Sequence, residues 1–223
     1  RLVRTNVGGT AARRLYEAAL AEDSTFARAA LALAQLDEGM QQGPATARAL
    51  ALATTAPPLV GLLVRVEHAL ATDDVAAGPL ADSLATRFPE EPDALLVLGR
   101  ARWQGGDFAD AAAAYDRVWA LDSAHVRDRE RPTCPACAAS SGAVNALLAA
   151  DSLEAAVAHA RRWVAADPGY WQPWSALADI LVYAGRWEEA RVATDSMAAR
   201  GGPEETHFRL FAAQQAGDSA GFE

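Results

Sequence analysis

The motif Cys134-Pro135-Ala136-Cys137 is the one local arrangement of residues in the chain that could carry chemistry. A CxxC pair can form half of a zinc site, but a structural zinc ion takes four ligands, and no second CxxC or HxxxH pair follows. His125, which precedes the motif, could supply only a third ligand. We therefore predict no metal site and no cofactor.

The state of the two cysteines is open to several interpretations. We favour a disulfide between Cys134 and Cys137 that staples a loop, followed by reduced structural thiols, metal ligands and a redox-active dithiol. Haem attachment would need a histidine directly after Cys137, and a dithiol oxidoreductase would need a strand before the motif; neither is present. A disulfide would favour an oxidising compartment such as the periplasm or cell surface, with the cytoplasm as the alternative.

Other residues with catalytic potential are scattered along the chain. Four histidines stand singly, at His68, His125, His159 and His207. His159 shares a helix face with Arg162, and we interpret it as an ordinary, partly exposed side chain. We find no glycine-rich phosphate loop and no GxSxG motif. We therefore predict that the chain is not an enzyme and has no catalytic residues.

Composition limits the partners. The chain has 223 residues, of which 51% are hydrophobic, and a net charge of −9 that would repel a phosphate backbone, so we expect no nucleic acid partner. All 20 basic residues are arginines, a bias typical of GC-rich bacteria. Pro57 and Pro58 interrupt the most apolar stretch, so we expect no membrane insertion. Because the chain begins at Arg1, we expect a fragment or a processed product.

A repeated helical hairpin organises the chain. In residues 92–123 and 171–202, apolar residues recur three and four apart in two runs, which is the spacing of amphipathic helices. Gly105-Gly106-Asp107 separates the runs of the first unit and Gly185 those of the second; glycine ends helices and aspartate begins them. Each unit is therefore predicted to be a pair of antiparallel helices.

These units resemble the tetratricopeptide repeat, a helix–turn–helix of 34 residues. Its large-then-small pair at positions seven and eight is matched by Leu98-Gly99 and Leu177-Ala178. The small residue at position twenty is matched by Ala111 and Ala190, and the later aromatic by Tyr115. The departures from the pattern are Thr194, Val118, Met197, Ser123 and Gly202. The resemblance, which covers nearly the whole chain, implies an all-α, right-handed superhelical solenoid of about six repeats.

Unit boundaries follow from the closing residues, which recur at steps close to 34 except for one longer step. The predicted units are 1–24 (a half unit), 25–58, 59–89, 90–123, 137–168 and 169–202, with an inserted loop at 124–136 and a capping helix at 203–223. The inserted loop carries charges and two prolines and lacks an apolar face, so we expect it to protrude.

The resemblance also implies a concave face lined by the first helix of each pair. The residues mapped to this face are Arg28, Leu31, Gln35, Leu62, Val66, Asp93, Leu96, Arg100, Trp103, Gln104, Asn145, Leu148, Asp179, Val182 and Tyr183. This mixed lining favours an extended or helical peptide from a partner protein. Family members that grip a C-terminal carboxylate use lysines, which this chain lacks, so we reject that mode.

Two functions remain in competition. We favour a non-catalytic scaffold that binds a protein or peptide. The runs DSTFA at 23–27 and RFP-x-x-P at 87–92 resemble repeat regions of bacterial signalling proteins, where such repeats form an interaction or sensory arm. The alternative is a structural subunit that forms homo-oligomers, because the open ends of a solenoid can stack on copies of themselves.

Overall fold

The computed structural model describes residues 8–41, 43–128 and 133–202. All regular secondary structure in these ranges is helical, which confirms the predicted all-α class. The helices are α1 (Gly8–Glu22), α2 (Ala27–Glu38), α3 (Pro44–Ala53), α4 (Pro58–Ala71), α5 (Ala77–Arg87), α6 (Pro92–Gln104), α7 (Phe108–Asp122), the 3-10 turn η1 (Ser123–His125), α8 (Pro135–Ala149), α9 (Leu153–Ala166), α10 (Trp171–Tyr183) and α11 (Trp187–Ala198).

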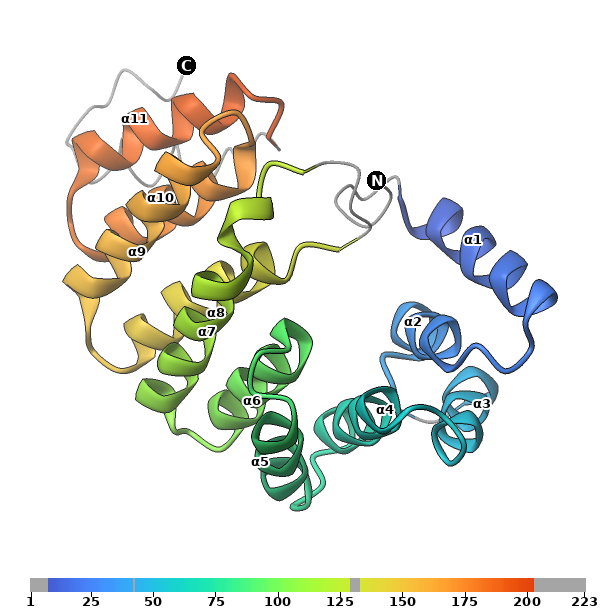
Figure 1. Cartoon of the computed structure of the whole chain (residues 1–223). Helices are drawn as coiled ribbons and strands as arrows, with labels where there is room; N and C mark the ends of the chain where they lie inside the picture. Colours follow the sequence, from blue (N-terminus) through green and yellow to red (C-terminus); the bar gives the residue numbers. More distant parts are fainter. Residues whose placement is uncertain (1–7, 42, 129–132, 203–223) are drawn as a thin grey trace.

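The helices form a solenoid of antiparallel pairs, as predicted. The chain curves into an open arc, with α2, α4 and α6 on its inner side and α3 and α5 on its outer side (Figure 1). Each helix packs mainly on the next in sequence, and the first helix of a pair also contacts the first helix of the following pair. Repeats that pack on their neighbours in this way build a solenoid without a single closed core.

Glycine and proline set the ends of several helices. Proline opens α3, α4, α6 and α8 in the first turn, where its missing N–H removes no helical hydrogen bond. Gly106, between α6 and α7, has φ +81°, and Gly185, between α10 and α11, has φ +66°. Side chains rarely adopt this left-handed backbone, so glycine permits the tight turn that reverses the chain.

The buried residues form a series of clusters along the array. The first joins α1 to α6, the next joins α5 to α8, and the last joins α8 to α11. Tyr115, 4% exposed, lies where α6, α7 and α8 meet. A Cβ at Gly142 would lie 2.6 Å from the ring of Tyr115, and one at Gly99 would lie closer still. Only glycine therefore lets α6 and α8 contact both sides of this ring.

The expected inserted loop at 124–136 differs from the structure in two ways. First, α8 already begins at Pro135, so the motif from Cys134 starts a helix. Second, the segment before it does not simply protrude: Val126 is 2% exposed and packs with Trp119 and Trp163. Arg127 also donates hydrogen bonds to the carbonyls of residues 165 and 166, which end α9 and lack helical partners. Val126 therefore anchors a segment that was predicted to protrude because most of its residues are charged or polar.

Two further expectations concern the ends of the chain. Residues 8–22 of the predicted half unit form α1, while the predicted capping helix at 203–223 lies outside the described residues.

In the part of the chain that the structure describes, no helix has both the length and the apolar character needed to cross a bilayer.

Candidate functional site

The residues mapped to the concave face differ widely in exposure. The exposed ones are Arg28, Gln35, Arg100, Trp103, Gln104, Asn145 and Tyr183; the half-buried ones are Leu62, Asp93, Leu96, Leu148, Asp179 and Val182. Leu31 and Val66 are buried, at 8% and 0% exposure, within the apolar cluster that joins α1 to α6. We correct their assignment, because neighbouring helices cover both side chains and leave no surface for a partner.

Polar residues on α6 are engaged by α4. Arg100 Nη1 donates to both carboxylate oxygens of Glu67, at 2.7 and 2.6 Å. Glu67 is only 6% exposed. A buried carboxylate without a cation is strongly unfavourable, so Arg100 has a structural task that the repeat pattern does not reveal.

Two more contacts continue this arrangement. Gln104 Nε2 donates to the Leu70 carbonyl and to Asp73 Oδ1, both at 2.8 Å, and so satisfies groups at the C-terminal end of α4. Arg28 of α2 pairs with Asp93 of α6. The predicted contact residues of this part of the face are therefore largely occupied by contacts between repeats. We call the inner side of α2, α4 and α6 the paired face.

The inner side of α8 and α10 is different. A pocket of about 260 Å³ opens between these helices. It is lined by Ser141, Val144 and Asn145 of α8 and by Trp171, Gln172, Ser175, Ala176 and Asp179 of α10. We call this pocket the neutral groove, because α8 contains no charged residue and Asp179 is the only one in α10.

The structure brings the predicted residues Asn145 and Asp179 together in the neutral groove. Sequence reasoning missed Ser141, Gln172 and Ser175. The signal for two of them was available, since Gln172 and Ser175 hold the second and fifth positions of the unit that begins at Trp171, and these positions line the face in the resembling family. The same signal was available for Ser141, which holds the fifth position of the predicted unit 137–168.

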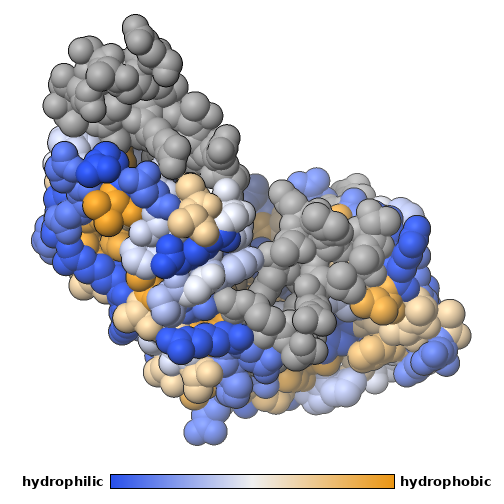
Figure 2. All heavy atoms as spheres, turned by 90° about the horizontal axis from the view of Figure 1, so that it is seen from above, coloured by the Kyte–Doolittle hydropathy of each residue, from blue (hydrophilic) through white to orange (hydrophobic). Residues whose placement is uncertain are grey.

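A second pocket, of about 300 Å³, lies across α9, α10 and α11 and is mostly apolar. Its lining includes Trp174, Leu177, Leu181, Val192 and Ala193. On the face that Figure 2 shows, the coloured residues are mainly hydrophilic and are interrupted by hydrophobic patches. Arg161, Glu188 and Glu189 complete the lining, so this pocket combines apolar surface with charged groups outside the neutral groove.

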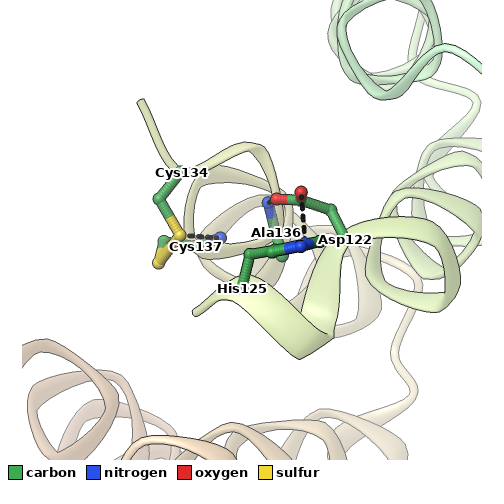
Figure 3. The surroundings of a disulfide bond; sticks show 5 residues. All are labelled: Asp122, His125, Cys134, Ala136 and Cys137. Carbon is green, nitrogen blue, oxygen red and sulfur yellow. Dashed lines mark hydrogen bonds and ion pairs between the residues drawn. A yellow bond between two sulfur atoms is a disulfide. The ribbon is translucent and has the colours of Figure 1, made fainter. Parts of the chain in front are cut away.

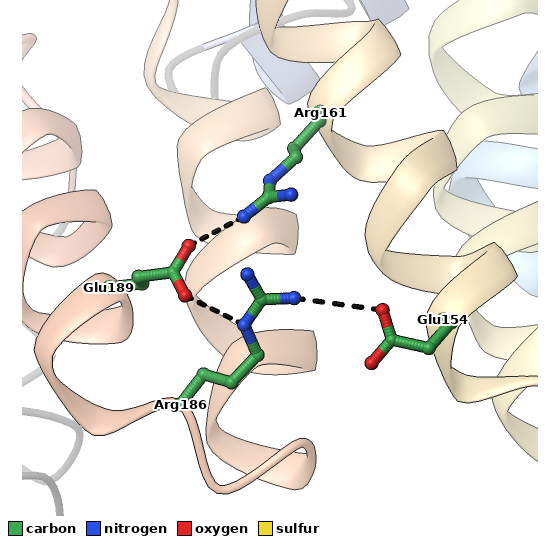
Figure 4. A network of polar contacts seen from close by, with 4 residues as sticks. All are labelled: Glu154, Arg161, Arg186 and Glu189. Carbon is green, nitrogen blue, oxygen red and sulfur yellow. Dashed lines mark hydrogen bonds and ion pairs between the residues drawn. The ribbon is translucent and has the colours of Figure 1, made fainter.

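Charged residues bridge α9 and α11 beside this second pocket. Arg161 pairs with Glu189 at 2.5 Å, and Arg186 contacts Glu189 at 2.7 Å and Glu154 at 3.7 Å (Figure 4). The hydrogen bond from Arg186 lowers the pKa of Glu189, and the same bond raises the pKa of Arg186. The network fixes the carboxylate in its ionised form and joins two helices, which is a structural arrangement.

His159 is buried, which corrects our interpretation of it as partly exposed. Its Nδ1 lies 3.3 Å from Asp116 Oδ1 and 2.8 Å from the guanidinium of Arg162, and its ring meets the edge of Trp119. Burial, followed by the positive charge of Arg162, lowers the pKa of His159 to about 4. The imidazole is therefore neutral near pH 7 and packs between α7 and α9.

The two cysteines form a disulfide at the start of α8 (Figure 3). Cys134 is the residue before the first helical turn, and Cys137 lies within that turn. Among the described residues, no group of three or more His, Cys, Asp or Glu side chains is placed to hold a metal ion.

The architecture is that of a tetratricopeptide-like helical repeat solenoid. No family model and no curated protein matches the chain. Solved structures that share the fold include yeast Tom70 (TM-score 0.65, 16% identity, 93% of this chain and 43% of that chain) and Cut9 in the APC/C hetero-tetramer Cut9–Hcn1 (TM-score 0.60, 18% identity, 96% of this chain and 40% of that chain). The chain spans less than half the length of either. At this identity the likeness concerns the fold alone.

Proposed function

We propose that the chain is a non-catalytic scaffold that binds an extended segment of a partner protein in the neutral groove. The observation that carries the proposal is the lining of this groove. The side chains of Asn145 and Gln172 each offer a donor and an acceptor, which suits the N–H and C=O groups of a peptide backbone. Trp171 adds an apolar surface against which a side chain can pack.

The negative charge of the chain indicates which kind of partner segment would bind. Asp179 is the only ionisable residue in the lining of the groove, and the chain as a whole carries a charge of −9. A segment with a basic side chain gains from the attraction of the whole chain during approach. We therefore propose a partner segment whose backbone N–H and C=O groups bind Asn145 and Gln172 and which carries one or more basic residues.

A displayed library of random peptides, selected on the intact chain, tests the proposal. Selected sequences should be enriched in arginine or lysine, and Asn145→Ala should weaken their affinity by about tenfold, the effect of one lost anchoring contact. The control is Arg191→Ala, which removes an exposed side chain on α11, away from the groove. Equal affinity of the Asn145→Ala and wild-type proteins would exclude the neutral groove as the binding site.

We also propose that the chain is an interaction or sensory arm of a larger bacterial protein. The arginine-only basic residues and the DSTFA and RFP-x-x-P runs support this origin. Mass spectrometry of the intact protein from native cells tests it, since the arm should be found within a longer polypeptide.

The competing function is a structural subunit that assembles with copies of itself. The apolar pocket across α9, α10 and α11 is the feature that favours it, because Val192 at its edge is 54% exposed. Light scattering across a concentration series separates the two functions. A mass that stays that of one chain supports the scaffold, whereas a mass that rises with concentration supports assembly.

A further inference from the structure

The start of α8 is held by the disulfide and by Asp122. The Sγ atom of Cys134 accepts a hydrogen bond from the Cys137 N–H at 3.2 Å, and Asp122 Oδ2 accepts one from the Ala136 N–H at 3.2 Å (Figure 3). Two of the N–H groups that a helix leaves without internal partners are therefore satisfied here. His125 Nδ1, 3.5 Å from Asp122 Oδ1, lies on the other side of that carboxylate.

The two sulfur-bearing residues differ in their access to solvent. Cys134 is partly exposed and packs at the edge of the cluster that contains Trp119, Val126 and Trp163, whereas Cys137 is 9% exposed and belongs to that cluster. A thiolate from solution can therefore approach the sulfur of Cys134, while the packed side chains shield that of Cys137.

We propose that Cys134 and Cys137 form a thiol–disulfide exchange site whose redox state sets the order of the first turn of α8. A thiolate attacks the Cys134 sulfur, forms a mixed disulfide and displaces the Cys137 sulfur, which takes up a proton. A second thiolate from solution then attacks the sulfur that the first one contributed to the mixed disulfide, and the Cys134 thiolate leaves and takes up a proton. In sum, two thiols become one external disulfide while the protein disulfide becomes two thiols.

Reduction has a structural consequence because the sulfurs move apart to non-bonded contact. Cys137 is confined by its packing, so Cys134 moves outward, and its sulfur no longer accepts the Cys137 N–H. The first turn of α8 then loses one of its two capping contacts and keeps the one from Asp122. Ser141, one turn after Cys137, belongs to the wall of the neutral groove, so the wall becomes less ordered. This last consequence rests on the proposed function of that groove.

A matched pair of variants tests the exchange chemistry. Cys137→Ser leaves the accessible thiol and Cys134→Ser leaves the packed one; both are treated with oxidised glutathione under native conditions and followed by mass. The variant that keeps Cys134 should form the mixed disulfide at least about tenfold faster. Equal rates, or a wild-type disulfide that resists millimolar dithiothreitol in the folded protein, would overturn the proposal.

Hydrogen exchange of the intact wild-type chain tests the structural consequence without any peptide. Reduction should speed exchange of the amides of residues 136–141 about tenfold and leave those of α4 unchanged. The Cys134→Ala/Cys137→Ala variant, which has no side-chain cap, should match the reduced protein and show no response to reductant. Unchanged exchange in 136–141 would refute the proposed redox control of α8.

The library-selected peptide then separates the two proposals. Weaker binding after reduction supports redox control of the groove, and equal binding in both redox states overturns that control. Absence of binding in both states contradicts the proposed function alone, since the exchange rates of 136–141 still decide the redox proposal.

Discussion

The paired face and the neutral groove occupy equivalent places in successive repeats but use their side chains differently. On the paired face, Arg100 serves a buried carboxylate on the neighbouring helix, and Gln104 serves a carbonyl and a carboxylate there. In the neutral groove, Asn145 and Gln172 line an open pocket. The comparison teaches that one repeat position can stabilise the array in one region, as Arg100 does, and line an open pocket in another, as Asn145 does.

The largest expected effect comes from removing the side chain between the two regions. Tyr115→Ala would empty the space between α6 and α8 and should lower the free energy of unfolding by about 4 kcal/mol. Chemical denaturation measures the change. Tyr183→Ala is the matched control, because Tyr183 is 69% exposed and its loss should change stability by less than about 0.5 kcal/mol. Similar losses in both variants would show that Tyr115 does not join the regions.

Acid should destabilise the region that contains α7 and α9 through His159. Its pKa is about 4 in the folded protein, below the ordinary value of 6.5, so the unfolded chain binds more protons between these pH values. The stability that depends on neutral His159 is complete above pH 6.5 and lost as pH falls toward 4. The loss is at most about 3 kcal/mol. Denaturation at several pH values should show a flatter profile for His159→Gln than for the wild type.

Arg100→Ala should destabilise the paired face by about 2 kcal/mol, because it leaves Glu67 buried without its cation while water enters the half-exposed arginine site. Adding Glu67→Gln to this variant removes the buried charge and should restore part of the loss. A double-mutant cycle followed by denaturation measures the coupling. Additive effects of the two substitutions would argue against the ion pair.

The smallest effect compares two glutamines. Gln104→Ala removes hydrogen bonds to Leu70 and Asp73 and should lower stability by about 1 kcal/mol. Gln172→Ala, in the neutral groove, should leave stability within about 0.5 kcal/mol of the wild type. Thermal unfolding of the two variants measures both values. A larger loss of stability for Gln172→Ala than for Gln104→Ala would contradict the structural role of Gln104 on the paired face.

The helical pairs could be predicted from sequence because their signals are local. Apolar spacing, glycine at Gly106 and Gly185, and proline at helix starts all act within one unit. The task of Arg100 could not be predicted in this way, since its partner Glu67 lies on another repeat and its burial depends on how the two helices pack. The same reason explains Val66 and His159, whose burial is decided by neighbouring helices.

Tyr115 also determines where the solenoid can bend. Its ring is in contact with the backbone of α6 at Gly99 and of α8 at Gly142. Closing the angle between these helices would drive backbone atoms into a rigid ring, and opening it would create a void. This junction is therefore stiff toward both changes of curvature, and elastic adjustment of the solenoid to a ligand must occur at other seams.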